Sequence, residues 1–141
     1  MSTRLKDKEE KIQQIITKLI EESAKGKLVV VEGKKDEVAL QELGVSGKFL
    51  TVKTGGKSFL DTVSEIEKME AKGVILLLDF DRRGKEGTNR LKQSLERAKM
   101  KPNTKFWREI SATVGKEIQC IESLPNYLQT LETKINISPR K

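Results

Sequence analysis

The chain has 141 residues, a net charge of +7, a single cysteine and no histidine. Its length fits one domain whose core buries roughly two-thirds of the unfolded surface. The missing residue types exclude an intrachain disulfide, an ordinary Cys/His zinc site and histidine acid–base catalysis. No apolar run approaches the roughly 18 residues of a membrane span, and no segment resembles a signal peptide, so we expect a soluble cytoplasmic protein without membrane contact.

Apolar spacing, glycines and prolines divide the chain into alternating helices and strands. In chain order we expect an amphipathic helix over 7–22, a strand over 28–31, a helix over 36–43, a strand over 48–52, a loop at 54–56, a helix opened by a capping box at Ser58 and closed by Gly73, a strand ending at Asp79, a basic helix carrying Leu91 and Leu95, a strand over 104–107, and a last helix starting at 123–125. Residues 117–121 fit a helix or a strand equally well.

Strands that alternate with helices predict an α/β fold in which helices flank a parallel sheet. We divide the chain into an N-terminal helix packed on the domain (1–26), the domain itself (27–135) and a flexible tail (136–141). The sequence shows no internal repeat and no low-complexity linker.

Acidic residues directly follow two of the predicted strands. Glu32 comes after the apolar run 28–31, and Asp79 and Asp81 come after the run 74–78. Ligands bind at the carboxyl ends of strands in open α/β sheets, and three carboxylates gathered there would repel one another without a cation. Oxygen ligands of this kind suit Mg²⁺ or Mn²⁺. Glu32 could complete the metal site or serve as a general acid or base.

Positive charge is concentrated immediately after the aspartate pair. Residues 82–108 contain ten basic residues and two acidic ones, so the segment is more basic than the chain as a whole. We interpret this segment as a nucleic-acid interface beside the metal site. The alternative for each lysine or arginine is a solvated helix face. The residues that we expect to contact phosphates are Lys34, Lys35, Lys53, Arg82, Arg83, Lys85 and Arg90.

Three other motif interpretations fail on the spacing or the order of their residues. Gly56-Lys57-Ser58 resembles the end of a P-loop, but Thr51 stands where that motif needs its leading glycine. Haloacid-dehalogenase-like phosphatases carry Asp-x-Asp after the first strand, whereas here it follows the third. A response-regulator receiver has the reverse order of acidic residues and gives no reason for the basic segment.

Three segments together resemble the Toprim domain of topoisomerases, bacterial-type primases, overcoming-lysogenization-defect nucleases and small ribosomal RNA maturases. They are Val29-Val30-Val31-Glu32-Gly33-Lys34-Lys35-Asp36, Thr54-Gly55-Gly56 and Leu78-Asp79-Phe80-Asp81-Arg82-Arg83-Gly84. The resemblance implies a compact, mostly parallel four-stranded sheet flanked by helices. It also implies that Glu32 acts as the general acid or base and that Asp79 and Asp81 hold Mg²⁺.

The resemblance is greatest to the small stand-alone maturases. Tyr127 is the only tyrosine and lies in the last predicted helix, so we expect no topoisomerase activity, and the chain has no room for primase or ATPase domains. We therefore expect a Mg²⁺-dependent phosphodiesterase or endonuclease acting on RNA or DNA. The alternative is a non-catalytic nucleic-acid-binding module within a larger processing complex.

Two further assignments stay open at this point. Glu117 follows a glycine two residues earlier, as a late acidic residue does in the maturases, so it is either an accessory acid or a solvated residue. Phe106 and Trp107 either stack on bases or pack in the core.

Overall fold

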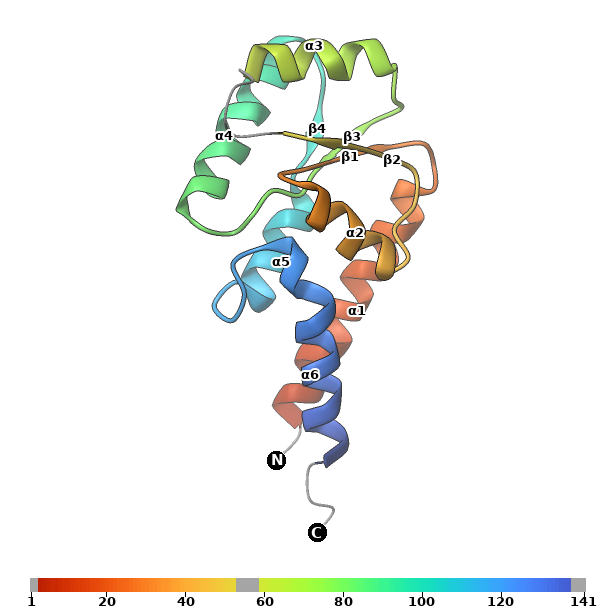
Figure 1. Ribbon diagram of the computed structural model, residues 1–141, viewed down its shortest axis with the longest axis vertical. Helices are drawn as coiled ribbons and strands as arrows, with labels where there is room; N and C mark the ends of the chain where they lie inside the picture. The colour runs from red at the N-terminus through yellow and green to blue at the C-terminus, as the bar shows by residue number, and fades with distance from the viewer. Residues whose placement is uncertain (1–2, 53–58, 138–141) are drawn as a thin grey trace.

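The computed structural model describes residues 3–52 and 59–137, and within them it forms an α/β fold, as predicted (Figure 1). Its elements are α1 (Thr3–Ser23), β1 (Leu28–Val31), α2 (Lys34–Glu42), β2 (Lys48–Thr51), α3 (Phe59–Met69), β3 (Val74–Leu76), α4 (Arg82–Arg97), β4 (Pro102–Asn103), α5 (Lys105–Val114), the short 3₁₀ helix η1 (Ile121–Ser123) and α6 (Leu124–Ile137). The predicted loop at 54–56, the capping residue Ser58 and Lys53 lie outside the described residues.

The four strands form one sheet in the order β2-β1-β3-β4, and every pair in it is parallel. β1 and β3 occupy the centre, and all of their residues are buried. Burial on both faces explains why these strands are continuous apolar runs rather than alternating ones. The register pairs Val30 with Leu76, which brings the residues after β1 and β3 to the same edge.

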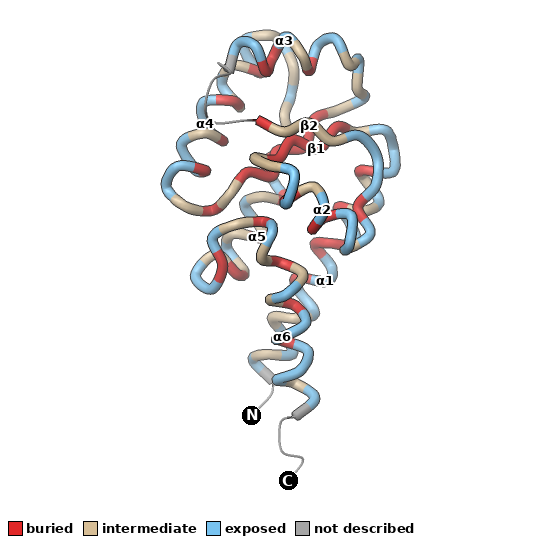
Figure 2. Tube along the Cα trace, in the orientation of Figure 1, coloured by how far each residue is buried: buried red, intermediate tan, exposed pale blue. Residues whose placement is uncertain are grey.

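Two hydrophobic cores cover the two faces of the sheet. Val29 and Val31 point into the first, which contains side chains of α1, α2, α5, η1 and α6. Leu28 and Val30 point into the second, which contains side chains of α3 and α4. Figure 2 shows buried positions recurring along the helices on both sides of the sheet. The molecule therefore has three layers, with helices on each face.

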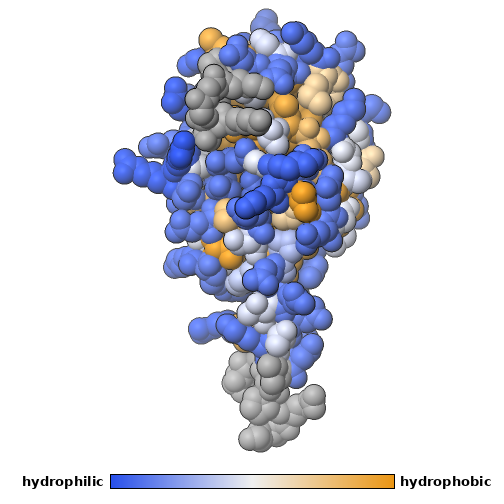
Figure 3. Space-filling view, in the orientation of Figure 1, coloured by the Kyte–Doolittle hydropathy of each residue, from blue (hydrophilic) through white to orange (hydrophobic). Residues whose placement is uncertain are grey.

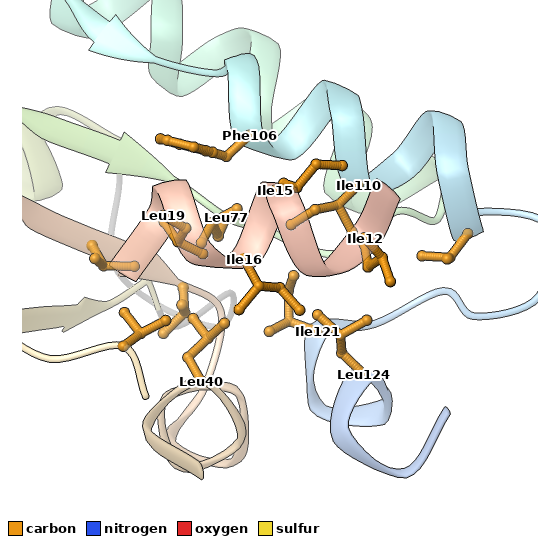
Figure 4. Packing of buried hydrophobic residues seen from close by; sticks show 14 of the residues in the cluster. Ile12, Ile15, Ile16, Leu19, Leu40, Leu77, Phe106, Ile110, Ile121 and Leu124 are labelled. Atoms are coloured by element: carbon orange, nitrogen blue, oxygen red, sulfur yellow. The ribbon is translucent and has the colours of Figure 1, made fainter. Parts of the chain in front are cut away.

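Helix α1 is the central element of the first core. Its buried residues Ile12, Ile15, Ile16 and Leu19 recur at the spacing of one helix face. Figure 4 shows these side chains between Phe106 and Ile110 of α5 on one side and Leu40, Ile121 and Leu124 on the other. The helix begins at Thr3, four residues before the predicted start. It ends before Gly26, whose φ of +92° suits glycine.

The prediction of a strand over 104–107 is wrong. The last strand is β4, and Lys105 begins helix α5. The Asn103 side chain accepts a hydrogen bond from the Lys105 backbone N–H (2.8 Å) at the start of this helix. Phe106, Ile110 and Val114 then recur every four residues and are all buried, so the period is helical.

Two other boundaries also differ from the prediction. β3 ends at Leu76 rather than at Asp79, although Leu77 N–H still donates to Val30 O (2.8 Å). Residues 115–120 contain turns and bends, so residues 117–120 of the ambiguous segment are neither helix nor strand, and residue 121 begins η1. Helix α6 continues through Ile137. No helix in the described ranges is both long enough and apolar enough to cross a membrane.

Candidate functional site

Glu32 and Asp79 meet at the carboxyl edge of the two central strands. Glu32 directly follows β1, and Asp79 lies three residues after β3. The Glu32 carboxylate accepts a hydrogen bond from the Asp79 backbone N–H, with 3.0 Å between Oε2 and N. The sheet topology thus brings together two acidic residues that lie 47 positions apart in the sequence.

Asp81 is the N-cap of α4. Its Oδ1 accepts a hydrogen bond from Gly84 N–H (2.8 Å), which satisfies one of the free donors in the first turn. Alternate residues of a strand point the same way, but Asp79 and Asp81 follow the end of β3 at Leu76, so the pleat of a strand does not set their directions. Phe80 between them is buried in the first core. The capping bond uses one carboxylate oxygen of Asp81 and fixes its position beside Asp79.

The structure adds Asp36 to this group, a residue for which the sequence predicts only a place in a helix. Asp36 is buried, and its Oδ2 accepts from Gly33 N–H (3.1 Å) at the start of α2. Its Oδ1 accepts from Glu122 N–H (2.9 Å), 86 residues further along the chain. The local spacing of a capping box could have suggested the first bond. No local signal predicts the second.

The 3₁₀ helix η1 closes the site from the C-terminal part of the chain. Besides the bond from Glu122 to Asp36, the backbone N–H of Ile121 donates to Asp79 Oδ1 (3.4 Å). Ile121 itself is fully buried in the first core, which holds η1 in place. Two carboxylates of the site are therefore positioned by backbone donors on one short element.

Burial and mutual repulsion raise the pKa of Asp79 to about 7. Desolvation of the half-buried carboxyl is the largest cause, followed by the negative charges of Glu32 and Asp36, with a smaller effect from Asp81. The pKa of Asp36 is also raised, mainly by burial. These carboxylates lie close enough together to oppose one another's ionisation, and a cation would relieve that repulsion.

Trp107 and Gly84 pack closely around the backbone of Asp79. The indole Nε1–H of Trp107 donates to Leu78 O (2.9 Å) and Asp79 O (3.3 Å). A Cβ on Gly84 would lie 2.1 Å from Asp79 O, so only glycine lets α4 approach this closely. Phe106 is buried, and Trp107 packs against the same core, which favours core packing over base stacking for both residues.

The predicted phosphate-binding residues flank the acidic group on two helices. Lys34 and Lys35 begin α2, and Arg82, Arg83 and Lys85 lie in the first turn of α4; all five are exposed. Arg90, also exposed, lies further along α4. Lys34 Nζ is 3.2 Å from Glu37, and Arg82 Nε is 3.5 Å from Glu86. Lys53 is outside the described residues.

Glu117 lies apart from the carboxylate group. It pairs with Lys8 of α1 and accepts a hydrogen bond from Tyr127 OH of α6 (3.3 Å). The hydrogen bond and charge of Lys8 lower the pKa of Glu117. These contacts link the two ends of the chain, so they favour a structural role over that of an accessory acid.

The donor set fits Mg²⁺ in its chemistry, because Glu32, Asp79 and Asp81 offer only carboxylate oxygens. Their geometry is not that of a preformed metal cage. Within residues 3–52 and 59–137, no three histidine, cysteine, aspartate or glutamate side chains are grouped closely enough to hold an ion. Each of the three carboxylates accepts a backbone N–H with one of its oxygens.

A sequence model of the Toprim domain matches residues 26–104, which is more than half of the chain. The chain belongs to the Toprim family. The match contains Glu32, Asp36, Asp79 and Asp81, and it ends before α5, η1 and α6. Toprim membership assigns the protein to nucleic-acid processing in general, in a family whose domains generally bind Mg²⁺.

Archaeal relatives extend the similarity beyond the Toprim domain. A UPF0292 protein of Methanocaldococcus jannaschii is 38% identical over 120 residues, which are 84% of this chain and 91% of that one. A UPF0292 protein of Methanosarcina acetivorans is 31% identical over 129 residues, covering 92% and 88% of the two chains. The fold is similar to that of a putative protein from Aquifex aeolicus, with a TM-score of 0.63, 26% identity and coverage of 78% and 94%.

Proposed function

We propose that this Toprim protein is a Mg²⁺-dependent phosphodiesterase that cuts RNA or DNA. The observation that carries the proposal is the contact between Glu32 and Asp79, together with the raised pKa of Asp79. Acidic groups held together against their own repulsion at the carboxyl edge of a parallel sheet are typical of a functional site rather than of a structural one.

In this mechanism Asp79 and Asp81 would hold the metal, and Mg²⁺ bound there would supply positive charge to the phosphate oxygens. Glu32 transfers a proton to or from the reacting oxygen, since it lies against Asp79 at the same edge. Ile121 N–H of η1 donates to the Asp79 carboxylate, and Asp36 holds η1 by accepting Glu122 N–H. The exposed cations of α2 and α4 contact flanking phosphates and set the position of the strand.

The second candidate is a nucleic-acid-binding module without catalytic activity that works within a larger complex. The hydrogen bonds of the carboxylates favour it, because Asp81 caps α4 and Glu32 binds the Asp79 N–H. Such bonds stabilise the fold whether or not the residues take part in a reaction. In this alternative the metal site helps to hold a phosphate, and a partner protein supplies the chemistry.

A cleavage assay separates the two candidates. End-labelled single-stranded and duplex RNA and DNA are incubated with the protein and either Mg²⁺ or Mn²⁺. We expect cutting by the wild type, and a loss of at least about 100-fold in rate for Glu32→Gln and for Asp79→Asn. Binding of the same substrates should change less than about threefold, because the phosphate contacts of α2 and α4 are intact.

Glu67→Gln is the matched control, since Glu67 is an exposed acid near the end of α3, which precedes β3 and so lies toward the edge of the sheet opposite the carboxylates. It should cut at the wild-type rate. Cutting that survives in both site variants would show that the activity belongs to a contaminant. Binding without cutting by the wild type, with either metal and every substrate, would establish the binding module instead.

A further inference from the structure

A groove between α2 and the start of α6 opens beside the acidic site. Its volume is about 310 Å³, within the range of small-molecule pockets. One wall comes from α2 and includes Lys35 and Val38, and the other comes from η1 and α6 and includes Glu122, Pro125 and Asn126. We call this cavity the α2–α6 groove. Of its lining residues, only Lys34 and Lys35 have a role in the proposed phosphodiesterase reaction, as phosphate contacts.

The groove combines an apolar surface with polar groups that carry no net charge. Val38, Ala39 and Pro125 supply the apolar part, and Val38 is 41% exposed, one of the two exposed large hydrophobic residues of the described chain. Figure 3 shows a hydrophobic spot over α2 that hydrophilic residues surround. Two lysines and two glutamates of the lining balance each other, and Asn126 adds an amide. This surface suits a flat, neutral, hydrogen-bonding group better than it suits a phosphate.

The groove and the acidic site share a wall. Asp36 accepts Gly33 N–H with one carboxylate oxygen and Glu122 N–H with the other. Gly33 directly follows Glu32 of the acidic site, and the side chain of Glu122 lines the groove. Lys34 and Lys35 begin α2 between the two features. A ligand whose phosphate lies at the acidic site therefore has the groove as its immediate neighbour.

Three of the eight residues that line the groove lie outside the Toprim match. That match ends at residue 104, whereas Glu122, Pro125 and Asn126 belong to the following segment. The acidic residues and α2 come from the shared domain, but the second wall comes from η1 and α6. This wall is thus a place where the chain can add selectivity to the general chemistry of the domain.

We propose that the α2–α6 groove binds an unpaired nucleobase next to the phosphate at the acidic site, so that the substrate is single-stranded at this position. The proposal rests on nucleic acid binding at the acidic site and names the class of substrate. A base enters a cavity between two helices only when its faces and edge are free of a partner strand. Val38, Ala39 and Pro125 contact the base face, while Asn126 and Glu122 meet its hydrogen-bonding edge.

Binding to intact substrate tests the groove separately from catalysis. Fluorescein-labelled single strands of RNA and of DNA, and blunt duplexes of the same sequences, are titrated with the full chain in Ca²⁺, a cation that carboxylates also bind, and anisotropy gives Kd while a gel verifies that the label stays uncut. We expect single strands to bind about tenfold more tightly than duplexes. Val38→Glu places a carboxylate against the base and should weaken single-strand binding about tenfold while leaving duplex binding unchanged.

Leu60→Glu is the matched control, since Leu60 is the other exposed large hydrophobic residue and lies on α3, on the opposite face of the sheet. It should bind both substrates as the wild type does. Asn126→Ala, at an exposed position of α6, provides a second variant should Val38→Glu unfold, and it should weaken single-strand binding about threefold. A thermal melt of each variant verifies folding.

The proposal would be overturned if the wild type bound single strands and duplexes with the same Kd. It would also be overturned if the Val38→Glu variant were folded and bound single strands with the Kd of the Leu60→Glu variant. These outcomes are distinct from failure of the proposed reaction. If the protein prefers single strands but cuts nothing, the groove proposal stands and the proposed phosphodiesterase activity is wrong. If the Val38→Glu and Leu60→Glu variants cut single strands equally well, the phosphodiesterase proposal stands and the groove proposal is wrong.

Discussion

The structure holds the carboxyl of Asp79 in a position that disfavours its ionisation. This carboxyl is half-buried beside Glu32 and Asp36, which makes ionisation unfavourable and raises its pKa to about 7. The Asp79 backbone is held by the hydrogen bonds to Glu32 and from Trp107, and the carboxyl accepts a hydrogen bond from Ile121 N–H that it would lose on turning away to solvent. In the absence of a cation, this residue should therefore lower the stability of the fold at neutral and alkaline pH.

The sign of this effect can be measured with Asp79→Asn in a chelator. A carboxyl whose pKa is 3.8 when unfolded and about 7 when folded stabilises the protein below pH 4, and that contribution is lost as pH rises through 7. We expect Asp79→Asn to be more stable than the wild type at pH 8, and the difference to shrink as pH falls through 7 and to vanish below about pH 4. Solvent screening of the half-buried group limits the gain to about 1 kcal/mol.

Urea unfolding at several pH values checks this prediction, with Glu67→Gln as the control that should follow the wild type. Saturating Mg²⁺ at pH 8 should raise the free energy of unfolding of the wild type to that of Asp79→Asn, and it should leave the stability of Asp79→Asn unchanged. A variant that is less stable than the wild type at pH 8 would show that the carboxylate is already compensated in the metal-free protein.

The proximity of Glu32 and Asp79 was predictable from the sequence, because neighbouring parallel strands carry their following residues to one edge. Their role as ligands stays a prediction. The place of Asp36 in the site was not predictable, because one of its two bonds joins residues 86 positions apart. Such a contact depends on how η1 packs against the rest of the fold, and no local sequence pattern predicts that packing.

At the scale of elements, the C-terminal segment completes a site that belongs to the Toprim domain. η1 and α6 follow the matched residues, yet Ile121 and Leu124 are fully buried beside Ile12 and Ile16 of α1. The backbone of η1 then reaches Asp36 and Asp79. The first core is thus the physical connection between the ends of the chain and the carboxylates.

Asp36→Asn tests this connection. An asparagine side chain has one acceptor and one donor group, so it cannot accept from both Gly33 N–H and Glu122 N–H. Removing the charge also relieves repulsion from Glu32 and Glu122, which offsets part of the loss. We expect a net destabilisation of about 1 kcal/mol in urea unfolding in a chelator at pH 8.

The control for this variant is Glu37→Gln, one residue away on α2. It removes only the ion pair with Lys34, which is partly exposed and should contribute less than about 0.5 kcal/mol. If Asp36→Asn were as stable as Glu37→Gln, the bonds from α2 to η1 would add nothing to the fold.

The elements themselves were largely predictable, with one instructive failure. The buried strands β1 and β3 follow from their continuous apolar runs, and α1 follows from its regular spacing. Residues 104–107 were misassigned because four residues with two aromatics suit a strand as well as a helix. The wider window that includes Ile110 and Val114 reveals the helical period of α5.

At the scale of the whole molecule, positive charge lies along α4 next to the carboxylates. Arg83 and Lys85 are exposed in the first turn of this helix, directly after Asp81. If both contact phosphates, the affinity for nucleic acid should fall steeply with salt, because bound counterions are released. The double variant Arg83→Gln, Lys85→Gln should reduce the slope of log K against log salt by about 1.4 for single strands.

Lys68→Gln with Lys72→Gln is the control of equal charge. These exposed lysines precede β3 and therefore lie toward the opposite edge of the sheet. Anisotropy titrations over a series of salt concentrations give both slopes. Equal slopes for the two double variants would mean that α4 is a solvated face and that nucleic acid binds elsewhere.

The binding of Mg²⁺ itself is the most direct test of the carboxylate site. Isothermal titration calorimetry at pH 8 compares the wild type with Asp79→Asn, and Glu67→Gln serves as the control. We predict saturable binding to the wild type and to the control, with affinity at least about tenfold weaker for Asp79→Asn because it loses a charged ligand. Unchanged affinity in Asp79→Asn, or no saturable binding to the wild type, would contradict the assignment of Glu32, Asp79 and Asp81 as a metal site.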